Sequence, residues 1–532
     1  MNSMHRRTTI GLTFAISALL GTPARAQTSN KCAEMAGLKV PGMNVEIKKA
    51  ESIPAGPAPA LAFPGPPITS PLPAYCRIDG TIDPRRGAGG KPYGIGFAIA
   101  LPDPWNGRFL FQGGGGLNGS VFLPLGSQAS ANTPALARGF TVVSTDTGHT
   151  GTGVFDGSFY EDQQASLDFA YVANARVTVL AKQIIAAYYG RPPDHSYFAG
   201  CSTGGREGMV MAQRNPTFFD GIVSGAPAMR VGFSGIGSRA IAVALNQAAP
   251  KDASGKPNPS ALFSDSDKQL IMTGILNACD AKDGLKDRMI FNTQACNFDP
   301  SVLTCRGAKS DGCLTAQQAG ALKKAFTAVT DSKGSQVYAR FLPDTGVITT
   351  TGGGLFRGIL TPPSAGGRFP ANLSTSQDVD AELAAAIANP QTALTDTASW
   401  TNLSSFSGRG GKWIFYHGVS DPGFSAQDTV EYYETMIKAN GGESARSWTR
   451  LFLEPGMGHC SGGEAALDSF DLLGAVVDWV EKGVAPDSVI ATGKAFPGRS
   501  RPLCPYPTYA HYKGQGDVED AKNFACRANP SN

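Results

Sequence analysis

The stretch that most constrains this 532-residue chain covers residues 200–205 and reads GCSTGG. The apolar run SYFAG before it is typical of a buried strand, and residues 204–214 have the pattern of a helix that ends before Pro216. A serine at G-x-S-x-G spacing between a strand and a helix is typical of a nucleophile elbow. The motif alone is also compatible with an ordinary glycine-rich turn. Ser202 is therefore a nucleophile only if the rest of the chain supplies a base.

Strand-like and helix-like segments alternate on both sides of this serine. Apolar runs predict strands at residues 93–102, 107–112, 139–145, 196–200, 219–225, 412–418 and 448–456, and helical spacing predicts helices at 165–190, 425–440 and 469–483. This alternation predicts a mostly parallel α/β sheet.

Two regions depart from the alternation. Residues 27–90 are rich in Pro and Gly, and we expect them to wrap irregularly around the core. Residues 228–408 contain clustered cysteines and Ser/Thr/Gly/Pro-rich stretches, and they predict a large inserted lid domain. The catalytic domain would then comprise residues 27–227 and 409–532.

The nucleophile needs a histidine to accept its proton and a carboxylate to orient that histidine. In the α/β-hydrolase fold the acid and then the histidine follow the serine along the chain. Asp421, in YHGVSDPGFS, and His459, in LFLEPGMGHCSGG, each follow a predicted strand, and we expect them to complete the triad. His417 precedes Asp421 and is interpreted as a structural histidine near the site. His511 lies in a cysteine-flanked tail and is not preferred as the base.

Two of the ten cysteines flank the predicted nucleophile and base, because Cys201 precedes Ser202 and Cys460 follows His459. A disulfide between them would hold the two Cα atoms within about 4.4–6.8 Å and join the two loops. Two unrelated structural cysteines are the alternative. Disulfides fit an even number of cysteines in an exported chain, whereas zinc would need Cys or His at ligand spacing, which the sequence lacks.

The first 26 residues have the features of a secretory signal, with Arg6, Arg7, an apolar run and A-x-A at 24–26. The apolar run is shorter than the roughly 20 residues that a membrane span needs. We therefore expect a secreted or periplasmic protein without a membrane anchor. Beyond this leader 43 basic and 43 acidic residues remain, which argues against nucleic acid or an anionic membrane as a partner. The sequence indicates no oligomeric state.

An ester hydrolase also needs backbone donors for the oxyanion that forms on the carbonyl. The amide of Thr203, directly after the serine, is one candidate. The glycine run 113–116, after a predicted strand, is expected to supply the second. A phosphate-binding loop is the competing interpretation, but no Gly-Lys-Ser/Thr follows.

The predicted insert contains an acidic loop, NACDAKDGLKDRMIFNTQAC. Asp280, Asp283 and Asp287 lie within eight residues, and with the carbonyls of Leu285 and Met289 they would suit Ca²⁺. The spacing differs from that of an EF-hand, and a solvated acidic turn is the alternative. Any ion here would be structural, because no histidine that could help to activate water is nearby.

Four stretches resemble the tannase and feruloyl esterase family: GCSTGGREGM, YHGVSDPGFSAQDT, PGMGHCSGG and RPLCPYP. The resemblance covers nearly the whole chain after the leader. It implies an α/β-hydrolase core with a calcium-binding lid, and the triad Ser202, Asp421 and His459. It also implies Gly116 and Thr203 as oxyanion donors. The calcium ligands implied are Asp280, Asp283, Leu285, Asp287 and Met289, and the disulfides implied are Cys201–Cys460, Cys32–Cys76, Cys279–Cys296, Cys305–Cys313 and Cys504–Cys526.

WNGRFLFQGGGGLNGS and FDGIVSGAP are similar to family members that hydrolyse terephthalate monoesters, in which an aromatic residue at the position of Phe424 stacks on the substrate ring. Residues 338–400 are shorter here and contain one tryptophan, Trp400, with Arg357 and Arg368 as candidates to bind a substrate carboxylate. We therefore expect a serine esterase for small esters of aromatic, phenolic acids. A terephthalate monoester hydrolase is the alternative, and an exported non-catalytic binding protein on the same scaffold is the alternative from another class.

Overall fold

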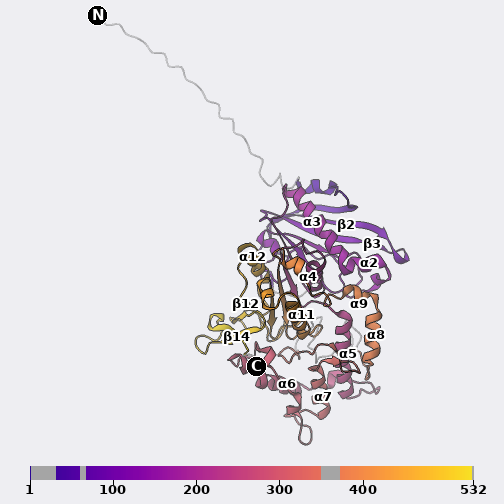
Figure 1. Cartoon of the computed structure of the whole chain (residues 1–532), viewed down its shortest axis with the longest axis vertical. Helices are drawn as coiled ribbons and strands as arrows, with labels where there is room; N and C mark the ends of the chain where they lie inside the picture. The colour runs from indigo at the N-terminus through magenta and orange to yellow at the C-terminus, as the bar shows by residue number, and fades with distance from the viewer. Residues whose placement is uncertain (2–30, 60–66, 349–371, 530–532) are drawn as a thin grey trace.

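A nine-stranded mixed sheet forms the centre of the computed structural model, which describes residues 1, 31–59, 67–348 and 372–529 (Figure 1). The strand order is β1-β2-β3-β5-β4-β6-β7-β10-β11. The strands are β1 (Val45–Ile53), β2 (Ala74–Arg86), β3 (Pro92–Asp103), β4 (Arg108–Gln112), β5 (Thr141–Thr145), β6 (His195–Cys201), β7 (Gly221–Gly225), β10 (Lys412–Gly418) and β11 (Thr449–Glu454). The six strands from β5 to β11 in this order are parallel, and β1, β2 and β3 pair antiparallel at one side.

Helices cover both faces of the parallel part. α3 (Ala173–Tyr189), α4 (Thr203–Arg214) and α11 (Ala426–Ala439) share one hydrophobic cluster, whereas α12 (Leu472–Lys482) belongs to a second. Neighbouring strand residues alternate between the clusters: Phe415 points into the first and Ile414 into the second. Strands buried on both faces need apolar residues at every position, which is why continuous apolar runs predicted them. The architecture is the expected α/β-hydrolase core.

The N-terminal region differs from its prediction. Within residues 27–90 the described part forms β1 and β2 rather than irregular wrapping. β2 pairs with β3 from Ala74↔Asp103 to Arg86↔Pro92. Alternate β2 residues, Ile78 and Ile82 among them, are fully buried. The Gly and Pro content suggested loops, but long-range pairing with a strand of similar length decides strand formation here.

The part of the chain that the structure describes between β7 and β10 adds no strand to the nine-stranded sheet. It forms α5 (Val231–Ala248), α6 (Asp265–Cys279), α7 (Ala316–Ala325), α8 (Val379–Ala388), α9 (Pro390–Thr395), α10 (Ser404–Ser407) and the small pair β8 (Val329–Thr330) and β9 (Gln336–Tyr338). Much of it shares a separate hydrophobic cluster. In Figure 1, α6 and α7 lie at the opposite end of the molecule from β2 and β3. This arrangement accords with an insert, and the domain boundaries stay a prediction.

The C-terminal part ends in two short antiparallel pairs, β12 (Val489–Thr492) with β13 (Ser500–Leu503), and β14 (Thr508–Tyr512) with β15 (Phe524–Ala528). Five disulfides form, with the same pairs that the resemblance implied. No helix in the described residues is long and apolar enough to cross a bilayer. The predicted signal peptide falls almost wholly in residues 2–30, outside the described residues.

Candidate active site

Ser202 lies at the sharp turn between β6 and α4. Its φ of 64° and ψ of −123° are rare for a residue with a side chain, and such strain accompanies a nucleophile elbow. The turn is so tight that a Cβ on Gly200 would lie 2.5 Å from the carbonyl oxygen of Gly204. The Ser202 amide donates to the Gly225 carbonyl at 3.0 Å, and the Ala228 amide donates to the Ser202 carbonyl at 3.0 Å. These contacts fix the serine at the carboxyl end of β6.

Asp421 and His459 meet at the ends of the adjacent strands β10 and β11. His459 Nδ1 lies 2.6 Å from Asp421 Oδ2. The Asp421 side chain is fully buried, and its Oδ1 accepts from the amides of Gly423 at 2.8 Å and Phe424 at 3.1 Å. Burial by itself raises the pKa of Asp421, but the charge of His459 and hydrogen bonds from His417 and His459 outweigh it, and the pKa is lowered. An ionised Asp421 is suited to hold His459 in the tautomer that accepts a proton at Nε2.

A disulfide joins the serine turn to the histidine loop. Cys201 and Cys460 are 259 residues apart in the chain, and their Cα atoms lie 5.9 Å apart. Each half-cystine is the covalent neighbour of a predicted catalytic residue, Ser202 on one side and His459 on the other. The bond therefore keeps the two loops adjacent, as the flanking cysteines predicted.

Some backbone amides near the serine donate to protein acceptors and others do not. The amides of Gly113 and Gly114 have protein acceptors at 2.9 and 3.0 Å. The amides of Gly115, Gly116 and Thr203 donate to no residue that the structure describes. Gly116 has a φ of 60°, and the Thr203 hydroxyl donates to the Gly116 carbonyl. The two predicted oxyanion donors therefore lie on facing segments, and neither amide has an acceptor among the described residues.

His417, interpreted from the sequence as a structural histidine near the site, lies beside the acid. It is fully buried, and its Nδ1 lies 2.8 Å from Thr429 Oγ1. Its Nε2 lies 3.2 Å from Asp421 Oδ2 and 3.1 Å from the Phe424 carbonyl. The Phe424 ring centroid lies 5.3 Å from that of His459, so this aromatic side chain is beside the triad. Its stacking on a substrate stays a prediction.

Asp344, from the predicted lid, is a site residue that sequence reasoning missed. Its side chain is fully buried, and Oδ2 accepts from Ser420 Oγ at 2.6 Å and from the Gly456 amide at 2.7 Å. Ser420 directly precedes the predicted acid, and Gly456 lies three residues before the predicted histidine. One carboxylate thus links both loops. The only sequence signal was an aspartate within FLPDTG, which does not reveal its partners.

The predicted calcium ligands follow α6. Asp280 and Asp283 are buried, and both accept backbone amides, with Phe291 N at 3.0 Å from Asp283. Burial, with the negative charges of Asp287 and Asp280, raises the pKa of Asp283 to about 8. Asp287 Oδ2 lies 2.5 Å from Arg501 Nη2. In the described ranges no three His, Cys, Asp or Glu side chains are arranged to hold a metal ion. The donor chemistry suits Ca²⁺, and the calcium site stays a prediction.

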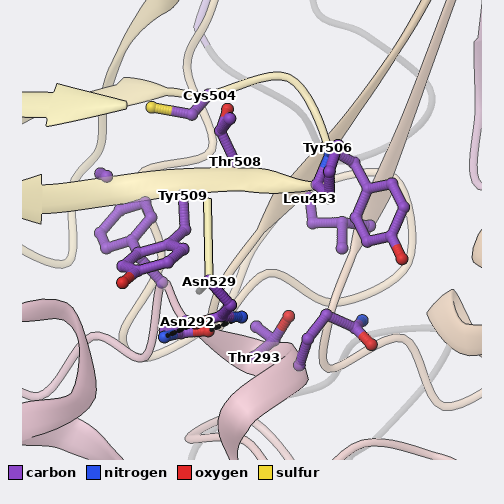
Figure 2. Close-up of a pocket in the computed structure, with 12 residues that line it drawn as sticks. Asn292, Thr293, Leu453, Cys504, Tyr506, Thr508, Tyr509 and Asn529 are labelled. Carbon is purple, nitrogen blue, oxygen red and sulfur yellow. Dashed lines mark hydrogen bonds between the residues drawn. The ribbon is translucent and has the colours of Figure 1, made fainter. Parts of the chain in front are cut away.

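A pocket in another part of the molecule is not the predicted ester site. Figure 2 shows it between residues 291–294 and the C-terminal strand β14, and none of the three predicted catalytic residues lines it. Asn292 and Asn529 exchange hydrogen bonds of 2.7 and 3.0 Å across it. Arg357 and Arg368, the candidates for binding a substrate carboxylate, lie outside the described residues.

Comparisons with known proteins agree on one family. A family model described as "Tannase and feruloyl esterase" matches residues 76–361 and 370–527. Mono(2-hydroxyethyl) terephthalate hydrolase from Piscinibacter sakaiensis is 38% identical over 524 residues and covers 86% of each chain. Probable feruloyl esterase B-1 from Aspergillus fumigatus is 31% identical, over 80% of this chain and 81% of the relative. The crystal structure of feruloyl esterase B from Aspergillus oryzae, 27% identical, superimposes with a TM-score of 0.74, over 94% of this chain and 100% of the other.

Proposed function

Because the chain belongs to the tannase and feruloyl esterase family, we propose that this carboxylic ester hydrolase cleaves small esters of aromatic, phenolic acids. One observation carries the proposal. Asp421 and His459 make a buried contact of 2.6 Å, and the Cys201–Cys460 disulfide joins the loop of His459 to the strained turn of Ser202. These are the three groups that serine ester hydrolysis requires.

The proposed reaction has two halves. Ser202 Oγ attacks the ester carbonyl carbon while His459 Nε2 takes the hydroxyl proton. When the C–O bond to the alcohol breaks, His459 gives the proton to the departing alkoxide and the acyl group remains on Ser202. Water then attacks this acyl-enzyme with His459 again as the base, which releases the aromatic acid and restores the serine. Asp421 stays ionised throughout and stabilises the charged imidazole.

The amides of Gly116 and Thr203 are proposed to bind the oxyanion of each tetrahedral intermediate. Both are without a described acceptor, and the Thr203 hydroxyl holds the Gly116 carbonyl. Donors aimed at developing charge act strongly because they need no reorganisation during the reaction, and losing one typically lowers kcat about 10²–10³-fold.

The acyl group is proposed to be aromatic, because Phe424 lies beside His459. Feruloyl or gallate esters are the first candidates. A terephthalate monoester is the second, favoured by the 38% identity to the Piscinibacter sakaiensis hydrolase. We expect kcat/KM for methyl ferulate, methyl gallate or mono(2-hydroxyethyl) terephthalate to exceed that for methyl butyrate, and Ser202→Ala to abolish turnover of all four. A preference for the aliphatic ester, or an active alanine variant, contradicts the proposal.

A structural Ca²⁺ is proposed in the loop after α6. The carboxylates of Asp280, Asp283 and Asp287 and the carbonyls of Leu285 and Met289 would hold it, since hard oxygen donors suit this ion. Bound there, it would neutralise three clustered acidic groups and would take no part in the reaction.

Export is proposed from the signal-like residues 1–26. The five disulfides support it, because such bonds persist in oxidising compartments. N-terminal sequencing of the protein from culture medium or periplasm should find the chain starting at residue 27.

A further inference from the structure

Glu207 is a buried carboxylate that the proposed reaction does not use. It lies on α4, four residues after Thr203, and is fully buried. Its Oε2 accepts from the Gly114 amide at 3.0 Å, and its Oε1 accepts from Asn118 Nδ2 at 2.7 Å. These two partners flank Gly116 on either side. The Glu207 carboxylate therefore hydrogen-bonds to residues on both sides of Gly116, in the loop that carries a proposed oxyanion donor.

Other hydrogen bonds also hold this loop: the Thr203 hydroxyl donates to the Gly116 carbonyl, the Gly204 amide donates to the Gly114 carbonyl, and the Leu117 amide donates to the Val154 carbonyl. Four consecutive glycines, residues 113–116, offer no side chains for packing and have the greatest backbone freedom. A Cβ on Gly114 would lie 2.4 Å from the Asn118 side chain, so the loop also closes too tightly for a larger residue. The position of the Gly116 amide thus depends on contacts from outside the loop.

No ion pair compensates for the burial of Glu207. No cation in the described residues lies within salt-bridge distance of its carboxylate. The adjacent Arg206 donates instead to the carbonyls of Ala170 and Phe169, in the π-helical turn Asp168–Val172. A buried carboxylate is costly unless hydrogen bonds satisfy it. Two of those of Glu207 go to the glycine loop, and the Asn174 side chain on α3 is a further partner.

We propose that Glu207 is a positioning residue that sets the Gly116 amide relative to the nucleophile. Helix α4 begins directly after Ser202 and also carries Glu207. The Glu207 carboxylate therefore attaches the glycine loop to the same helix that positions the serine. A buried carboxyl group that accepts two hydrogen bonds is suited to this task, because losing either bond would leave a buried polar group unsatisfied. The inference rests on the proposed function, in which Gly116 and Thr203 together bind the oxyanion.

Two substitutions of similar size separate the acceptor from the packing. Glu207→Gln keeps an oxygen for the Gly114 amide. Its new NH2 group would replace the oxygen that accepts from Asn118 Nδ2, and it can donate to Asn118 Oδ1 when the Asn118 amide turns over. Glu207→Met removes every acceptor. We expect kcat on the best aromatic ester to stay within about 3-fold for Gln and to fall about 10- to 100-fold for Met, with KM changing less than about 3-fold.

A second readout separates positioning from general stability. An arylboronic acid forms a tetrahedral adduct with the serine, and its affinity should fall in Glu207→Met by the same factor as kcat, while the affinity of the product acid is unchanged. Rates are taken per active site titrated with a fluorophosphonate. Asp267→Asn is the matched control, because Asp267 is a buried carboxylate in the insert, bonded to Lys309 and Gln318; it should lower stability and leave kcat unchanged.

Each result bears on the inference. If Glu207→Met does not fold, Asn118→Ala removes one of the two hydrogen bonds between Glu207 and the loop. It should lower kcat and boronate affinity together by about 3- to 10-fold. Unchanged kcat per titrated site in the folded variant overturns the role of Glu207 alone. An inactive wild-type protein overturns the proposed function instead, so the two failures are distinguishable.

Discussion

Removing the Cys201–Cys460 disulfide should cost both stability and rate. The bond closes a loop with a sequence separation of 259 residues. Chain entropy assigns such a closure about 5.5 kcal/mol of unfolding free energy at 25 °C. The double substitution Cys201→Ala, Cys460→Ala removes both sulfur atoms and leaves no unpaired thiol at the site. It also loosens the loop of His459, which keeps its contact with Asp421 and, through the Gly456 amide, with Asp344. We therefore expect kcat to fall about 10- to 100-fold.

The Cys305–Cys313 disulfide in the insert is the matched control. Its sequence separation is only 8 residues, for which the same treatment gives about 2.5 kcal/mol. Guanidinium unfolding followed by tryptophan fluorescence compares the two double-alanine variants, and kcat is measured per fluorophosphonate-titrated site. The control should lose less stability and keep its kcat. A Cys201/Cys460 variant that has wild-type kcat, or that loses no more stability than the control, refutes the reasoning.

Three further predictions follow from buried carboxylates. Burial raises the pKa of Asp146 to about 7, whereas in the unfolded chain it is about 3.9. The folded protein therefore binds this proton more tightly than the unfolded chain does. The Asp146 carboxyl consequently lowers the free energy of unfolding more and more as pH rises from about 4 to 7. Asp146→Asn keeps the oxygen that accepts from the Gly96 and Gly148 amides but does not titrate. The free energy of unfolding of this variant, relative to that of the wild type, should therefore increase from about pH 4 to 7. A difference that stays constant over this range contradicts the assignment to Asp146. Chelation should lower Tm, and restoring Ca²⁺ to 100 times its Kd should return about 2.7 kcal/mol, whereas Asp283→Asn should not respond to chelator. Asp344→Leu removes the acceptor shared by the acid and histidine loops and should lower kcat about 10-fold at similar KM; steady-state kinetics check this, and an unchanged kcat excludes such a role.

Local sequence signals were sufficient wherever one segment carries both the structure and the chemistry. The apolar runs located the parallel strands, because burial on both faces leaves no polar alternation. Ser202, Asp421 and His459 could be proposed since each directly follows such a run, and chain order then selected His459 over His417. The cysteines beside the serine and the histidine added a long-range contact that spacing alone could not provide.

The remainder depended on partners distant in sequence. β1 and β2 were missed because the Gly and Pro content of residues 27–90 suggested loops, whereas the pairing of β1 with β2 and of β2 with β3 is revealed only by the fold. Asp344 bonds to a residue 112 positions away, and Glu207 to one 93 positions away. No sequence window contains both members of such a pair. A lone Asp or Glu among apolar residues gives no indication of which loop it will hold.

These long-range links act on different pairs of site elements, so their effects on stability and rate should separate. The disulfide joins the serine turn to the histidine loop, and breaking it relaxes both the unfolded chain and the site. Glu207 joins the nucleophile helix to the glycine loop, and its loss leaves the disulfide and the Asp421–His459 contact intact. A Glu207 variant should therefore retain attack by Ser202 while the oxyanion is poorly bound. In the disulfide variant the main defect should lie in proton transfer, because the histidine loop is loosened while backbone hydrogen bonds of Ser202 and Gly204 still hold the serine turn.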